Sequence, residues 1–219
     1  MAGTAARTVR SRGYTTLSLP VLRDRVLGDA ATTAQAVVEG ALLGLYRYDR
    51  LKQVPKFEKS KRIDAITLIV ERSGDVAGAK RGVDKATVIA EAVSLARDLI
   101  NGPANLVTPT VLANQARQLA KQYHLKCTVI PFAQLKRLGF GGIVGVAQGS
   151  AHPAQFIVLE YRPARSKATF ALCGKGITFD TGGISLKPSS KMELMKYDMA
   201  GAAAVLGTVK ASAEMKLPY

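Results

Sequence analysis

The chain has 219 residues, of which 47% are hydrophobic and 21% are charged. These fractions exclude an intrinsically disordered chain, and the length allows one large domain or two small ones. The charge is unusual, because 31 lysines and arginines against 16 acidic residues give a formal net charge of +15. Such an excess indicates a polyanionic partner, a targeting segment, or a chain whose acidic part lies elsewhere.

The N-terminal segment, residues 1–23, carries arginines and no acidic residue. Its composition resembles an organellar transit peptide. The alternative is a basic surface helix over residues 5–12 followed by a strand over residues 15–19. We favour the helix and strand, because residues 14–20 alternate like a strand and no small-residue cleavage site is evident. The expected location is therefore cytoplasmic, with organellar import as the alternative.

Helix and strand patterns alternate along the rest of the chain. Apolar residues at helical spacing, several of them behind capping residues, predict helices, and short apolar runs predict strands. A glycine-containing loop is expected over residues 71–82. The expected helices cover residues 34–47, 84–100, 109–123, 132–138 and 199–215, and the expected strands cover residues 66–70, 127–130, 143–147, 156–161 and 168–173.

This alternation predicts an α/β fold with a largely parallel or mixed sheet. We expect two domains, residues 1–76 and residues 77–219. The longest charge-free stretch, residues 138–159, is too rich in glycine and polar residues for a membrane-spanning helix, so no membrane partner is expected. The two cysteines, Cys127 and Cys173, lie in apolar runs and predict buried free thiols in a reducing compartment.

The segment that carries chemistry begins where an expected strand ends. Lys175 lies between two glycines, and Asp180 precedes the turn Thr-Gly-Gly. Lys187 and Asp198 follow, so two lysines and two aspartates gather beyond one strand. A P-loop is excluded, because that motif needs Gly-Lys followed by Ser or Thr, and here Gly176 follows the lysine. A structural ion-pair network and a metal site with carboxylate and neutral lysine ligands both remain open.

Longer motifs decide between them. The runs GKGITFDTGGISLKP (residues 174–188), MKYDMAGAA (residues 195–203) and ARDLINGPANLVTP (residues 96–109) resemble the signature of the leucyl aminopeptidase family, the cytosolic two-metal M17 peptidases. The resemblance covers about residues 34–219 with good order and spacing. Its core, GKGITFDTGG, is long enough to be highly specific.

The resemblance implies a role for five residues. Lys175, Asp180 and Asp198 match metal ligands, and Asp180 would bridge two divalent ions, Mn²⁺ or Zn²⁺. Lys187 matches the catalytic lysine that polarises the scissile carbonyl and stabilises the oxyanion. Met195 matches a wall of the pocket for the N-terminal side chain. The implied reaction is metal-assisted hydrolysis of peptides with a free, leucine-like apolar N-terminal residue.

The chain also departs from the family pattern. Ala200 replaces a usual glycine and residues 189–191 a more glycine-rich loop, but neither is at a ligand position. A later family motif, which supplies two more acidic ligands and the arginine that holds bicarbonate, does not occur in these residues. We therefore expect an internal fragment: the C-terminal part of an N-terminal α/β domain, then the start of a mixed-sheet, phosphorylase/hydrolase-like catalytic domain. Alone it is expected to be inactive.

Three further expectations concern partners and surface. The resemblance implies a homohexamer. Two alternatives remain open: nucleic-acid binding, favoured by the net charge and by a basic cluster over residues 47–62, and a non-catalytic subunit of the hexamer. A fragment should also leave an open sheet edge and uncovered apolar surface around residues 202–206, and should therefore aggregate or be only partly ordered.

Overall fold

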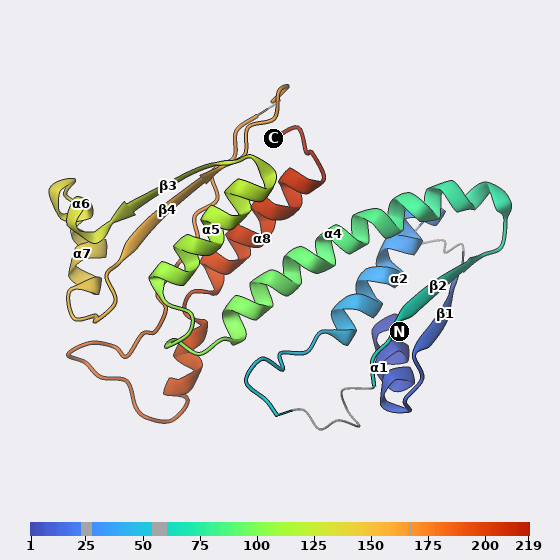
Figure 1. Ribbon diagram of the computed structural model, residues 1–219, viewed down its shortest axis with the longest axis horizontal. Coiled ribbons are helices and arrows are strands. Elements are labelled where there is room, and N and C mark those ends of the chain that lie inside the picture. The colour runs from blue at the N-terminus through green and yellow to red at the C-terminus, as the bar shows by residue number, and fades with distance from the viewer. Residues whose placement is uncertain (23–27, 54–60, 167) are drawn as a thin grey trace. The chain divides into compact units, whose positions relative to one another are not determined.

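The computed structural model describes residues 1–22, 28–53, 61–166 and 168–219 (Figure 1). The chain forms two compact units, residues 1–94 and residues 95–219. The expected domain boundary after residue 76 falls at the beginning of the long helix α4, Val76–Asn101, and it remains a prediction. Both units combine helices with a small sheet, which confirms the α/β class.

The first unit packs helices against a parallel pair of strands. As predicted, the N-terminal segment forms a helix and a strand, and Ala6, Leu19 and Ala41 form a buried cluster between them and α2. The side chain of Asp29 caps α2 by accepting a hydrogen bond from the Thr32 N–H at 2.8 Å. The elements are α1 (Ala2–Ser11), β1 (Thr16–Val21), α2 (Ala30–Leu45), β2 (Ala65–Val70), the short 3₁₀ helix η1 (Ser73–Asp75) and the first part of α4.

Helix α4 begins earlier than the sequence predicts. The expected loop over residues 71–82 is wrong, because the helix starts at Val76. Gly82 allows close packing on α2, because a Cβ atom there would lie 2.1 Å from the carbonyl oxygen of Ala31. A glycine that permits such an approach looks, in sequence alone, like one that ends a helix.

In the second unit, α5 and α8 lie side by side next to an antiparallel strand pair (Figure 1). Thr108 caps α5, and Pro109 occupies its first turn, as predicted. The elements are α5 (Pro109–Tyr123), β3 (Lys126–Pro131), α6 (Phe132–Arg137), α7 (Gly141–Ala147), β4 (Gln155–Glu160), the 3₁₀ helix η2 (Met192–Tyr197) and α8 (Ala200–Glu214).

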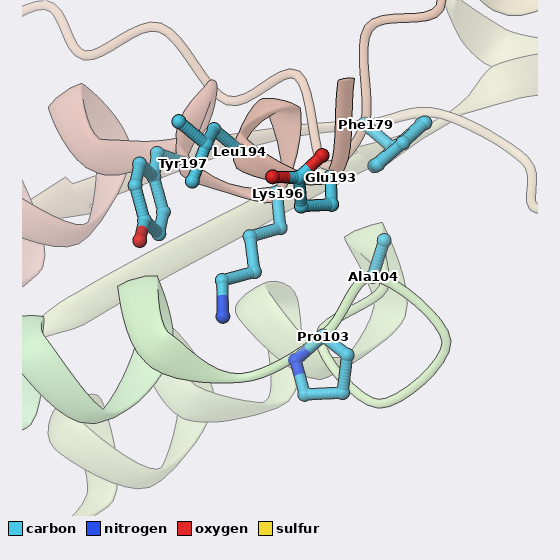
Figure 2. Close-up of a pocket in the computed structure, with 7 residues that line it drawn as sticks. All are labelled: Pro103, Ala104, Phe179, Glu193, Leu194, Lys196 and Tyr197. Atoms are coloured by element: carbon cyan, nitrogen blue, oxygen red, sulfur yellow. The ribbon is translucent and has the colours of Figure 1, made fainter. Parts of the chain in front are cut away.

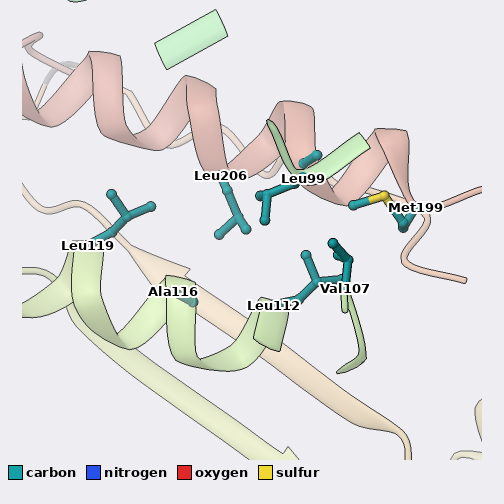
Figure 3. Close-up of a cluster of buried hydrophobic side chains, with 8 residues drawn as sticks. Leu99, Val107, Leu112, Ala116, Leu119, Met199 and Leu206 are labelled. Carbon is teal, nitrogen blue, oxygen red and sulfur yellow. The ribbon is translucent and has the colours of Figure 1, made fainter. Parts of the chain in front are cut away.

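One apolar core holds these elements together (Figure 3). Met199 is completely buried, and it joins the N-terminal end of α8 to Leu99 of α4 and to α5. This end of α8 directly follows the motif that carries Asp198. The core consists of Leu99, Val107, Leu112, Ala116, Leu119, Met199, Ala203 and Leu206.

Two expected strands are wrong. Residues 143–147 lie in helix α7, because a short apolar run with glycines suits a helix as well as a strand. Residues 168–173 are assigned to no strand, since no described strand pairs with them. The expected apolar exposure also lies elsewhere: Leu206 is buried, whereas Phe170 and Leu172 are 68% and 53% exposed. The expected burial of the thiols is wrong for Cys173, which is exposed, and Cys127 is half-buried. Aggregation remains a prediction.

No helix among the described residues is both long and apolar enough to cross a membrane.

Far from the motif, α5 and α8 share a polar contact. The hydroxyl of Tyr123 and the ammonium of Lys210 both donate to Oε2 of Glu214, each at 2.7 Å. Burial alone would raise the pKa of the Glu214 carboxyl, but these two hydrogen bonds and the lysine charge outweigh it and place the pKa below its ordinary value.

We therefore expect Glu214→Gln to lower the free energy of unfolding near neutral pH. A carboxyl whose folded pKa is lowered stabilises the fold above its unfolded pKa of about 4.3, and this contribution is lost as the pH falls through the folded value. The difference between wild type and variant should therefore shrink in acid. Urea unfolding at several pH values measures it, with the exposed Glu193→Gln as control. A difference that does not change with pH would contradict the prediction.

Candidate metal and catalytic site

A close approach between two backbone segments positions the motif residues. A Cβ atom on Gly174 would lie 2.5 Å from the carbonyl oxygen of Gly201, and one on Gly201 would lie 2.8 Å from the Lys175 nitrogen. The N–H of Ala202 donates to the carbonyl of Lys175 at 2.9 Å. The segment with Lys175 is therefore fastened to the first turn of α8, just after Asp198.

This approach brings Lys175 and Asp198 together. The lysine Nζ lies 3.2 Å from Oδ2 of the aspartate. That oxygen is buried, yet it accepts no hydrogen bond of normal geometry, so the contact is an ion pair by distance only. A buried carboxylate oxygen that lacks a directional partner is costly. It is therefore a carboxylate oxygen that Lys175 pairs by charge alone, and it can also take a cation as a ligand.

The second pair is held by a glycine turn. Nζ of Lys187 donates to Oδ2 of Asp180 at 2.8 Å and lies 3.1 Å from the sulfur of Met195. The other carboxylate oxygen of Asp180 accepts the N–H of Gly182 at 2.9 Å. Gly182 and Gly183 have φ angles of +91° and +73°, which glycine adopts without strain.

The two pairs act on each other electrostatically. The hydrogen bond from Lys187 lowers the pKa of the Asp180 carboxyl, as do the N–H of Gly182 and the charges of Lys187 and Lys175. The carboxylate is thus ionised at neutral pH and available to a cation. The structure brings Lys175 to Asp198, and Lys187 to both Asp180 and Met195. These contacts match the ion-pair interpretation, and the same donors also suit a metal.

The donor set fits a divalent cation only in part. Aspartate oxygens are hard ligands that Mg²⁺ and Mn²⁺ prefer, and Zn²⁺ accepts them as well. Across the described ranges, however, no group of three or more histidine, cysteine or acidic side chains is placed to hold a metal. The described residues therefore offer two carboxylates and two lysines at this site, fewer ligands than two ions require.

A pocket of about 420 Å³ adjoins the site (Figure 2). Phe179 and Leu194, which line it, directly precede Asp180 and Met195. No sequence pattern predicted this pocket, although the ARDLINGPANLVTP motif includes two of its residues, Pro103 and Ala104. The lining consists of Pro103, Ala104, Phe179, Glu193, Leu194, Lys196 and Tyr197.

Comparison with known proteins gives the family. The catalytic domain of the cytosol aminopeptidase family (Peptidase_M17) matches residues 94–219, and its N-terminal domain matches residues 1–55. A probable cytosol aminopeptidase of Solibacter usitatus is 44% identical over 99% of this chain and 43% of its own length. One of Syntrophotalea carbinolica is 47% identical over 84% of this chain and 37% of its own length.

A solved structure agrees with this likeness. The bottromycin maturation enzyme BotP in complex with Mn has a TM-score of 0.81 at 38% identity, and the match covers 99% of this chain and 44% of BotP. The chain thus spans about two fifths of the length of the relatives that it matches. Because the catalytic-domain match covers more than half of its residues and confirms the resemblance seen in the motifs, the chain belongs to the cytosol aminopeptidase family.

Proposed function

We propose that this chain carries part of the metal and catalytic site of an aminopeptidase. In this proposal Lys175, Asp180 and Asp198 are metal ligands, and Lys187 is the catalytic lysine. The substrates are peptides with a free N-terminus, with preference for a leucine-like, apolar first residue. The family membership supports the reaction class, and the structure of BotP with Mn supports a divalent metal.

The observation that carries the proposal is the buried Oδ2 of Asp198, which accepts no hydrogen bond of normal geometry although Nζ of Lys175 lies 3.2 Å from it. Lys175 already pairs with this oxygen by charge, and the absence of a directional hydrogen bond supports a role as a ligand for a cation. The ionised Asp180, whose carboxyl pKa is lowered, adds a second hard ligand close to the charge of Lys175.

The chain's own residues then have different roles in the proposed reaction. A divalent ion held by Lys175, Asp180 and Asp198 would supply Lewis-acid polarisation and a more acidic water. Asp180 and Met195 hold the ammonium of Lys187 at a fixed position, where its charge stabilises the oxyanion that develops on the scissile carbonyl. Met195, which Lys187 contacts, forms one wall for the apolar side chain of the N-terminal residue.

The remaining parts of the proposal rest on the family. They are two ions, Mn²⁺ or Zn²⁺, a bicarbonate that acts as base in the complete enzyme, a homohexamer and a cytoplasmic location. The likeness to probable cytosol aminopeptidases supports the location.

The first prediction from the proposed function concerns metal affinity. We expect the 219-residue chain to bind Mn²⁺, and Asp198→Asn to raise the dissociation constant by at least the ~10-fold that loss of an outer-shell partner costs, because a ligand itself is lost. Titration calorimetry and the electron paramagnetic resonance signal of free Mn²⁺ measure it. Glu193→Gln is the matched control, since it removes a nearby exposed carboxylate outside the ligand set. Equal affinity of wild type and Asp198→Asn would refute the assignment.

The second prediction concerns turnover. We expect no hydrolysis of Leu-p-nitroanilide by the purified 219-residue chain with Mn²⁺ or Zn²⁺, because its described residues supply too few carboxylates for two ions. The full-length Solibacter usitatus relative, assayed under the same conditions, is the positive control. Clear turnover by the chain that a chelator abolishes would contradict this prediction.

Nucleic-acid binding is a second candidate function, which the net charge of +15 favours. If lysines and arginines contact phosphates, the affinity for duplex DNA should fall steeply with salt, by about 10³–10⁵ between 50 and 200 mM for six to ten contacts. Binding measured by fluorescence anisotropy at two salt concentrations distinguishes the outcomes. A weak affinity with little salt dependence would exclude phosphate contacts.

A further inference from the structure

Lys196 has a contact that its position in the motif does not predict. It lies in η2 between Met195 and Asp198, but its side chain extends toward the segment that carries Pro103 (Figure 2). Its Nζ donates to the carbonyl oxygen of Asn101 at 3.0 Å, across 95 residues of sequence. The bond is partly buried, so solvent competes with it less than with a surface contact.

The acceptor lies where a helix needs a donor. Asn101 is the last residue of α4, and the last four carbonyls of a helix have no partner within it. The N–H of Gly102 donates to the carbonyl oxygen of Asp98 at 3.2 Å, and the helical ladder stops at Pro103, which has no N–H to continue it. An ammonium group satisfies the Asn101 carbonyl and also interacts favourably with the negative end of the helix dipole.

The contact matters because the backbone hydrogen bonds described within η2 are local. The N–H groups of Met192, Leu194 and Asp198 donate to carbonyls three residues earlier. Such bonds fix the shape of the turn but not its position in the unit. The bond to Asn101 ties it to α4, and buried Met199 fixes the chain just beyond it.

We propose that Lys196 is a positioning residue for the site. By holding η2 on the end of α4, it keeps the Met195 sulfur against Lys187 and keeps Asp198 against Lys175. This inference rests on the proposed function, because the site that it positions is the proposed metal site. Lys196 itself touches neither of these lysines in the described contacts; it acts through η2.

The test compares three variants of the 219-residue chain. Lys196→Met keeps the length of the stem and removes the donor and the charge, whereas Lys196→Arg keeps both. Lys121→Met removes an exposed lysine of α5 as a matched control. For each we would measure the dissociation constant of Mn²⁺, the melting temperature, and the amide hydrogen exchange of residues 192–199 without metal.

We expect Lys196→Met to bind Mn²⁺ about 10–100-fold more weakly, the cost typical of losing an outer-shell partner, and to exchange faster over residues 192–199. Lys196→Arg should keep the Mn²⁺ affinity and the exchange rate of residues 192–199 near those of wild type, and Lys121→Met should change neither quantity. If Lys196→Met does not fold, Lys196→Gln replaces it, since it keeps a donor without the charge and should fall between Met and Arg.

The proposal is overturned if Lys196→Met or its replacement binds Mn²⁺ as tightly as wild type. It is also overturned if Lys196→Arg binds Mn²⁺ as weakly as Lys196→Met. A wild-type chain that does not bind Mn²⁺ refutes the proposed metal site and with it the positioning of that site. The exchange data then separate the two failures: faster exchange in Lys196→Met still shows that Lys196 holds η2, whereas unchanged exchange refutes the tether itself.

Discussion

The contact on which the site depends is the close approach of Gly174 and Gly201. Any side chain at either position would collide with the opposing backbone, with distances of 2.5 and 2.8 Å from a Cβ atom. Only this approach lets Ala202 donate to the Lys175 carbonyl and places Lys175 beside Asp198. The core around Met199 and Leu206 holds α8 in place behind it. The geometry of the site thus requires glycine at both positions.

Charge is the second constraint, because lysines and aspartates here are mutually paired. A divalent cation and an ammonium group compete for the same carboxylate oxygen. In the proposed function, Asp198 and Lys175 would both hold the ion, so their present pairing would give way to that role. The second pair is different, since Lys187 keeps a contact with Met195 that does not use the carboxylate. This difference suits Lys175 to a ligand role and Lys187 to oxyanion stabilisation.

The surroundings show how a site of few residues depends on a larger scaffold. Lys196 ties η2 to α4, Met199 ties the start of α8 to the core, and the Tyr123–Glu214–Lys210 contact ties the far end of α8 to α5. Helix α8 is thus fixed at both ends, and the motif before it is held from two sides. Such support limits the freedom of the residues that would bind the ion.

The sequence by itself determined the family, the candidate residues and most helices, because a long motif is specific and helical periodicity and caps are local signals. Thr108 and Pro109, for example, fix the start of α5 with neighbours only. Tertiary structure decided what depends on distant partners. Gly82 permits helix packing rather than a loop, residues 168–173 lack a described strand to pair with, and Lys196 reaches a carbonyl 95 residues away. No local pattern encodes these contacts, since each exists only once the two segments meet.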